Sequence, residues 1–319
     1  MPSRKVFILL VLFLALPLPS LAQSSPWDPN LIHMEARQLV PGVYGVFADD
    51  VDKKDHTATS AGFVIGRDGV LVVESLINGT LASQLLGEIR KHTTLPIRYL
   101  VNTSYHGDHC YGNFVFPAGT TIIEHRATKE YIDTKFEADR KFMLGLMGPG
   151  RGIEEVVPRS ADLTLTDRVS IDLGGRKVEI LHIGFAQTPG DVIVWLPQEK
   201  IVFVGNMIQA PPPAIPWLLE GHHREAIVTL HRLYDMLDDQ AVIVPGHGRP
   251  MRRTDILYSV QYLTELGKEV EAAVARGLTL EQAQKTISMP KYSSYSLYPF
   301  AHVQINIPAV YRDLAGRKP

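Results

Sequence analysis

The hydrophobic positions of this chain of 319 residues alternate between short strand-like runs and helical stretches. In the first half, Val- and Ile-rich runs bounded by Gly, Asp or Asn are typical of half-buried or buried β-strands. They predict strands over residues 43–48, 62–65, 70–73, 97–101 and 121–124. Between them, apolar residues with helical spacing predict an amphipathic helix over residues 81–91.

The second half repeats this mixture, which predicts an α/β fold. We expect strands over residues 169–173, 178–183, 192–196, 201–204 and 241–244, a helix over 224–237, and helices from 254 onward, ending in 308–314. Residues 145–152 and 210–221 are expected to be irregular. The second of these stretches contains four prolines and Trp217, so it is a stiff loop. Trp217 then either forms a wall or lid of a pocket or packs its own loop onto the core.

Residues 1–22 have the pattern of an export signal. Arg4 and Lys5 precede an apolar run over 6–16, and a small-residue cleavage site ends at Ala22. The run is too short to span a bilayer, which needs about 20 residues. We therefore expect a periplasmic or secreted protein with no stable membrane insertion after cleavage; an uncleaved anchor is the alternative.

Composition and charge narrow the classes of partner. Hydrophobic residues make up 45% of the chain, enough for a large core, so a disordered protein is excluded. There are 32 basic and 34 acidic residues, a balance that argues against a nucleic-acid partner. With one cysteine, Cys110, no intramolecular disulfide can form. The oligomeric state is left open.

The densest group of metal-ligand side chains is His106, Asp108 and His109, directly after the predicted strand 97–101. Imidazole and carboxylate groups are the ligands that zinc commonly takes in catalytic sites. Three further loops, each after an apolar strand and each containing glycine, carry Gln187 with Asp191, then Asn206, then His247. The sequence therefore predicts a site assembled from four separate loops.

This ordered series resembles the metallo-β-lactamase-fold hydrolases over residues 40–250 or so. The resemblance implies a four-layer αββα sandwich with the metal site along one edge, between the two sheets. We expect that domain to occupy residues 23–250 and a C-terminal helical extension to occupy 251–319. The family's seven ligand positions fall on Ser104, His106, Asp108, His109, Gln187, Asn206 and His247, so three of them have changed to Ser, Gln and Asn.

The resemblance implies one metal position rather than two. One position of the family retains a single strong ligand, His106, beside Ser104 and Gln187. The other retains Asp108, His109 and His247, with Asn206 as a weak fourth ligand or a hydrogen-bond donor to bound water. Because Asp108 is the only anionic ligand, two divalent ions would leave about three positive charges uncompensated. One zinc ion, Zn²⁺, is expected, with Cys110 not among its ligands.

The expected function is metal-dependent hydrolysis of a small molecule. Zinc lowers the pKa of bound water to about 7, and the resulting hydroxide would attack the carbonyl of a lactam, lactone, ester or thioester. Asp108 and His106 would be the catalytic residues. His106 would act as a general base, orient the attacking water, serve as a further ligand, or only fix Asp108. The alternative is a non-catalytic protein that lost its metals and binds a small molecule.

The roles of four other site candidates are open. Asp191 caps a turn or orients a ligand, and Tyr105 donates to a substrate oxygen or packs. His222 contacts substrate or lies at a helix start on the surface, and Trp217 forms a pocket wall or packs. His182 is expected to be a satisfied strand residue.

Overall fold

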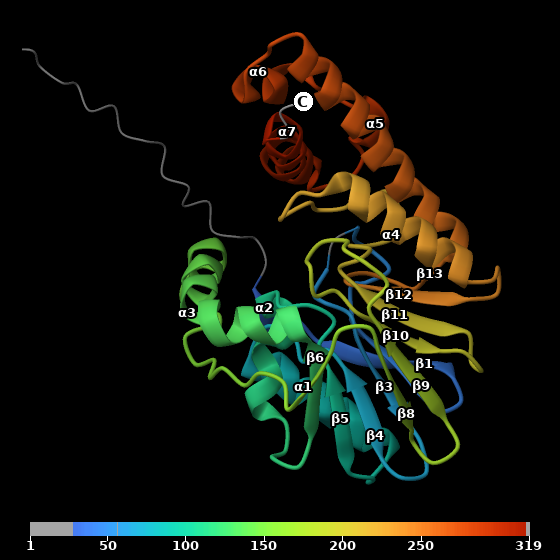
Figure 1. The fold of residues 1–319 in the computed structure, drawn as a ribbon. Helices are drawn as coiled ribbons and strands as arrows, with labels where there is room; N and C mark the ends of the chain where they lie inside the picture. The colour runs from blue at the N-terminus through green and yellow to red at the C-terminus, as the bar shows by residue number, and fades with distance from the viewer. Residues whose placement is uncertain (1–27, 56, 317–319) are drawn as a thin grey trace, which may run out of the picture.

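Two β-sheets lie face to face at the centre of the computed structural model, which describes residues 28–55 and 57–316 (Figure 1). The predicted export signal, residues 1–22, lies outside the described residues. Helices cover both outer faces, so the order of layers is helix, sheet, sheet, helix. The α/β fold and the four-layer sandwich expected from the sequence are confirmed.

The first sheet has seven strands in chain order. They are β1 (Met34–Val40), β2 (Val43–Ala48), β3 (Ala61–Ile65), β4 (Val70–Val73), β5 (Ile97–Val101), β6 (Thr121–His125) and β7 (Leu163–Leu165). Strands β1 to β4 pair antiparallel, and β4 to β7 pair parallel. The carboxyl ends of β4, β5 and β6 therefore meet at one edge of the sheet.

The second sheet has six strands. They are β8 (Arg168–Asp172), β9 (Lys177–Leu181), β10 (Ile193–Leu196), β11 (Ile201–Gly205), β12 (Val242–Pro245) and β13 (Met251–Arg252). Only β11 and β12 pair parallel, so their carboxyl ends also share an edge. Alternate residues of both sheets, among them Val73, Val101, Phe203 and Val244, form the core between the sheets.

Seven helices complete the described part of the chain. They are α1 (Gly79–His92), α2 (Gly107–Cys110), α3 (Arg126–Met147), α4 (His223–Met236), α5 (Ile256–Ala275), α6 (Leu280–Thr286) and α7 (Ile307–Gly316), with a π-helical segment over Pro299–Asn306. Helices α1 and α3 bury Leu85, Ile89 and Phe136 against the outer face of the first sheet. None of the described helices combines the length and apolar composition that a bilayer crossing demands.

The helical extension shares a core with the second sheet. Two residues of the extension, Leu266 of α5 and Val310 of α7, belong to one buried cluster. The same cluster contains Leu233 of α4 and Val202 and Ile243 of the sheet. Figure 1 shows α4 and α5 along this sheet and α6 and α7 beyond them. The division of the chain at residue 250 stays a prediction, because no gap in packing marks it.

The proline-rich loop 210–221 is packed between the second sheet and this extension. Its Ile215 and Leu218 are buried in the same cluster. The side-chain oxygen of Asn306, Oδ1, accepts a hydrogen bond from the Leu218 N–H at 2.8 Å, and its side-chain amide nitrogen, Nδ2, donates to the Pro216 carbonyl at 2.7 Å. Of the two alternatives for this loop, the structure favours packing over a lid.

The sequence interpretation missed five elements and misplaced one boundary. It did not predict the strands β1, β7 and β13, the short helix α2 or the long helix α3. Residues 145–147, predicted to be irregular, form the last turn of α3 before Gly148, whose φ of 82° ends the helix. The other expected strands and helices occur within about two residues of the predicted bounds, the usual scatter of element ends.

Candidate metal centre

Asp108, His109 and His247 converge at the edge of the sandwich where the parallel strands end. Asp108 and His109 lie on the short helix α2 after β5, and His247 follows β12. Each offers one ligand atom, and these atoms lie within 4.8 Å of one another. The Asp108 Oδ2 atom is 3.5 Å from His109 Nε2 and 3.2 Å from His247 Nε2. Two ligands about 2.1 Å from a tetrahedral zinc are about 3.4 Å apart, so this spacing suits a shared ion.

Hydrogen bonds to the outer side of each group fix its orientation. The His109 Nδ1 atom lies 2.9 Å from Glu74 Oε1, and His247 Nδ1 lies 2.9 Å from the Thr57 carbonyl oxygen. With Nδ1 of each imidazole engaged on the outer side, both rings present Nε2 toward Asp108. A carboxylate or carbonyl behind the histidine is the usual support of a histidine ligand. The Thr59 hydroxyl donates to Asp108 Oδ2 at 2.6 Å.

Charge and burial pull the pKa values of this cluster in opposite directions. Burial by itself would raise the pKa of Asp108, but His109, His247 and Thr59 outweigh burial and hold that pKa well below its usual range. Burial by itself would lower the pKa of His109, but the Asp108 and Glu74 carboxylates raise it to about 9. Asp108 is thus an anion at neutral pH, and a cation that binds His109 must displace a proton.

The donor set fits a divalent ion. His109 is fully buried, and its Nε2 atom has no hydrogen-bond partner among the described residues. A buried polar atom without a partner is costly unless something binds it. An ion held by His109, His247 and Asp108 would supply that partner, and three protein ligands are the number that a catalytic zinc takes while leaving a position for water.

Comparison with known proteins agrees with this geometry. The family model of the metallo-beta-lactamase superfamily matches residues 55–247, more than half of the chain. The chain belongs to the metallo-beta-lactamase superfamily. A linear primary-alkylsulfatase from Pseudomonas sp. is 20% identical over 289 residues, 78% of this chain and 54% of that protein. A metallo-beta-lactamase type 2 from Bacillus sp. strain 170 is 22% identical over 196 residues, 61% of this chain and 68% of that protein.

Solved structures of the superfamily show the same fold. A stereoselective inverting sec-alkylsulfatase from Pseudomonas sp. superposes with a TM-score of 0.71 at 17% identity, covering 89% of this chain and 51% of that one. A metallo-beta-lactamase from Pontibacter korlensis superposes with a TM-score of 0.56 at 17% identity, covering 72% of this chain and 99% of that one. The chain thus spans about half the length of the alkylsulfatases that it matches.

His106 and Asn206 lie together beside the three converging ligands. The Asn206 amide nitrogen is 3.4 Å from His106 Nδ1. Burial lowers the pKa of His106 to about 4, with Asp108 opposing that shift and His109 and His247 adding to it. His106 is therefore neutral at neutral pH. The side-chain oxygen of Asn206, Oδ1, is buried and has no hydrogen-bond partner among the described residues.

Ser104 and Gln187, which the sequence analysis assigned to a second metal position, are buried polar side chains. Ser104 is buried, and its hydroxyl oxygen accepts a hydrogen bond from the His106 N–H at 3.3 Å. Both side-chain polar atoms of Gln187 are buried without a partner in the described chain. Asp191 caps its own turn, accepting from the N–H groups of Gln187 at 2.6 Å and Thr188 at 2.9 Å. Of the two roles open to Asp191, the structure shows the turn cap.

The remaining candidates lie around this centre rather than in it. Tyr105 is buried and stacks on Tyr131 of α3, with ring centroids 3.6 Å apart. Trp217 packs edge-on against Phe300 at 5.5 Å. His222 is exposed at the start of α4 and contacts the Phe185 ring.

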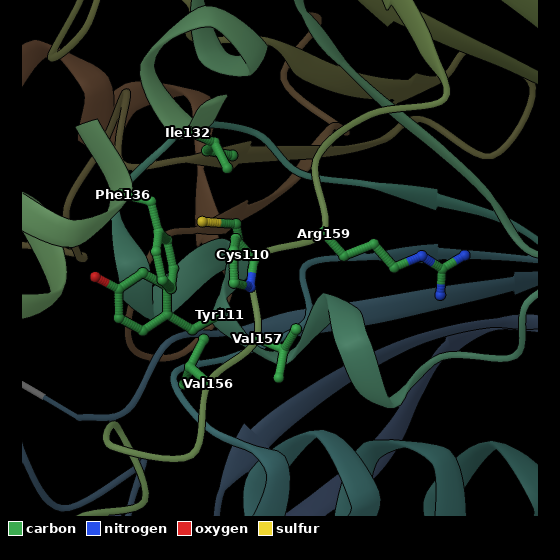
Figure 2. A pocket seen from close by; sticks show the side chains of 8 residues that line it. Cys110, Tyr111, Ile132, Phe136, Val156, Val157 and Arg159 are labelled. Atoms are coloured by element: carbon green, nitrogen blue, oxygen red, sulfur yellow. The ribbon is translucent and has the colours of Figure 1, made fainter. Parts of the chain in front are cut away.

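The side chains of His182 and Cys110 contact backbone carbonyl groups rather than the metal centre. His182 lies just beyond the end of β9, and its Nδ1 atom is 2.8 Å from the Asp191 carbonyl oxygen. The Cys110 thiol donates to the carbonyl groups of Tyr105 and His106 at 3.4 Å each. Cys110, Ile132 and Phe136 are among the residues that line a small pocket, and Figure 2 shows their side chains. The pocket has a volume of about 10 Å³, the size of one water molecule. Cys110 is absent from the cluster of converging ligand atoms.

Sequence reasoning missed Glu74, Thr57 and Thr59, the groups that orient the ligands. Glu74 directly follows the buried strand β4 and is itself buried. Its φ of 68° is the left-handed conformation that side chains rarely adopt, so the surrounding contacts hold it there. A carboxylate directly after four buried apolar residues was the available signal. The local sequence around Thr57 and Thr59 carried no such signal.

Proposed function

We propose that this protein is a metal-dependent hydrolase of small molecules that works with a single zinc ion. The observation that carries the proposal is the convergence of Asp108, His109 and His247 with both imidazole Nε2 atoms turned toward one point. The likeness to lactamases and alkylsulfatases supports hydrolysis as the reaction class.

When bound, zinc would act as a Lewis acid that activates water for attack on the substrate. Asp108 supplies the only carboxylate in the ligand set, and the Thr59 hydroxyl keeps its Oδ2 atom in place. His106 is too weak a base to hold a proton at neutral pH, because its pKa is about 4. With its Nδ1 atom facing the Asn206 amide, His106 presents Nε2–H, so we assign it a hydrogen bond to substrate or water rather than the removal of a proton.

The substrate class that we propose is a carboxylic acid derivative: a lactam, lactone, ester or thioester. A sulfate ester is the second candidate. It is favoured by the extent of the likeness to alkylsulfatases, which covers 89% of this chain and so includes part of the helical extension. The likeness to metallo-beta-lactamases covers 72% in the structure and 61% in the sequence.

Metal analysis of protein purified without added zinc tests the proposal. We expect close to one equivalent of zinc, and hydrolysis of at least one member of a panel of lactams, lactones, thioesters and alkyl sulfates that a chelator abolishes. Protein that takes up no zinc even when titrated with it, yet binds a panel compound, would establish the alternative of a non-catalytic binding protein.

A triple variant tests the assignment of ligand positions. Ser104→His, Gln187→His and Asn206→Asp together restore strong ligands beside His106. We expect the variant to bind a second equivalent of zinc. Uptake equal to that of the parent would contradict the assignment.

We also propose that residues 1–22 direct export and are removed. N-terminal sequencing of protein recovered from the periplasm or medium should begin at Gln23. Recovery in the cytoplasm with residue 1 intact would contradict this proposal.

A further inference from the structure

The loop between β2 and β3, described over residues 49–55 and 57–60, orients two of the three converging ligands. Its Thr57 carbonyl accepts the hydrogen bond from His247, and its Thr59 hydroxyl donates to Asp108. The Ser60 N–H donates to the Gly246 carbonyl at 2.7 Å, so this end of the loop is joined to the turn that carries His247. The conformation of the loop therefore sets the direction of both ligands.

The outer half of the same loop is tied to the helical extension. The Asp55 carboxylate accepts one hydrogen bond from the Ser296 N–H at 2.7 Å and a second from the Ser296 hydroxyl. The two residues are 241 positions apart. Hydrogen bonds to an ionised acceptor are stronger than neutral ones, and two from one residue also fix direction. Asp55 lies only two positions before Thr57.

The ion pairs at the tip of this loop hold it less firmly. Lys54 pairs with Asp50, and Asp52 pairs with Arg37, with side chains partly or largely exposed to solvent. Surface ion pairs of this kind contribute little to stability. Lys53 and Lys54 are both exposed.

Ser296, in contrast, lies on a turn with a rigid base. Tyr295, the preceding residue, is 1% exposed and belongs to the core shared by the second sheet and the extension. The Tyr298 N–H donates to the Tyr295 carbonyl at 3.0 Å, and the Tyr292 hydroxyl donates to Glu265 of α5 at 3.0 Å. The extension thus offers the loop a fixed point of attachment.

We propose that Asp55 and Ser296 are positioning residues through which the helical extension completes the metal centre, by holding the loop that orients His247 and Asp108. The inference rests on the proposed metal site. Without the Asp55–Ser296 contact, Asp55 loses its attachment to the extension, and Thr57 and Thr59 hold their ligands less well. We expect zinc affinity to fall by about 3- to 10-fold, less than the 10- to 100-fold typical of groups that touch a ligand directly.

The test uses the full chain with Asp55→Ala, Ser296→Ala and both changes together. Ser293→Ala is the matched control, because its hydroxyl is on the same turn but donates to the Pro290 carbonyl. Two quantities are measured: zinc affinity by chelator competition, and, in metal-free protein, the rate of tryptic cleavage after Lys53 and Lys54. Cleavage after Lys268, which is exposed but lies within α5, reports general unfolding.

We expect Asp55→Ala to weaken zinc binding and speed cleavage after Lys53 and Lys54 without speeding it after Lys268. Ser296→Ala should do so less, because its N–H remains. The double variant should match Asp55→Ala, because both residues act through one contact. Zinc affinity of Asp55→Ala equal to that of the control overturns the inference, whatever the cleavage rate. If the parent protein binds no zinc, the proposed function fails, and an unchanged cleavage rate in Asp55→Ala would then refute the loop contact separately.

Discussion

Glu74 should control how tightly the centre binds zinc, although it is not a ligand. Its buried carboxylate accepts hydrogen bonds from His109 Nδ1 at 2.9 Å, from the Thr103 N–H at 3.2 Å and from the Thr103 hydroxyl. Glu74→Gln preserves the shape but replaces one oxygen by an N–H₂ group, which then faces at least one of these donors. A hydrogen bond to a charged group contributes about 1.5–3 kcal/mol.

We therefore expect Glu74→Gln to lower zinc affinity by about 10- to 100-fold, equivalent to about 1.4–2.7 kcal/mol. Competition with a chromophoric chelator at neutral pH measures the zinc affinity. Glu124→Gln is the control: Glu124 is another buried glutamate near the end of a strand in the same sheet, and it does not touch His109. A Glu74→Gln variant whose affinity stays within twofold of the parent would refute the role that we assign to this carboxylate.

Three further predictions concern stability. Burial raises the pKa of Glu124 to about 8, above its ordinary 4.5, so the folded protein holds a proton there that the unfolded chain loses. The free energy of unfolding should therefore fall as pH rises from about 4.5 to 8, by up to about 1.4 kcal/mol per pH unit. Urea titrations should show a flatter pH profile of stability for Glu124→Gln. A Cβ at position 246 would overlap the Asn206 side chain and lie 3.0 Å from its backbone nitrogen, so Gly246→Ala should destabilise the fold by about 1–3 kcal/mol in urea denaturation and weaken zinc binding; a fully stable variant that binds zinc normally would contradict this. Gly87 lies inside α1 with open space around its Cα, so Gly87→Ala should raise stability by about 1 kcal/mol, and a lowered urea midpoint would count against it.

The local pattern of hydrophobic and polar residues predicted most of the fold. The buried strands β4 and β11 are continuous apolar runs, and that pattern survives in any fold that buries both faces of a strand. Helix α3 was missed because it buries only four residues, Thr128, Ile132, Phe136 and Met143, and carries charges between them. Strand β1 alternates weakly and has a single buried residue, so its pairing with β2 rather than its own sequence defines it.

The candidate site divides in the same way. The strand ends followed by loops with glycine indicated the site, and the resemblance to the metallo-β-lactamase-fold hydrolases implied that Asp108, His109 and His247 share an ion. The structure places their ligand atoms within 4.8 Å of one another. The sequence left open whether Asp191 caps a turn or orients a ligand and whether loop 210–221 covers a pocket. Contacts with Gln187 and Thr188 in the first case, and with Asn306 in the second, answer both questions.

The sequence by itself determined which residue types stand at the ends of the central strands, and with them the superfamily and the ligands that remain. Tertiary structure alone decided what holds those ligands: Glu74 behind His109, Thr57 behind His247, and the extension behind the loop that carries Thr57. The physical reason is that such a contact joins residues 35 to 241 positions apart. Each partner has an unremarkable local sequence, and only the packing of the two sheets and the outer helices brings the pair together.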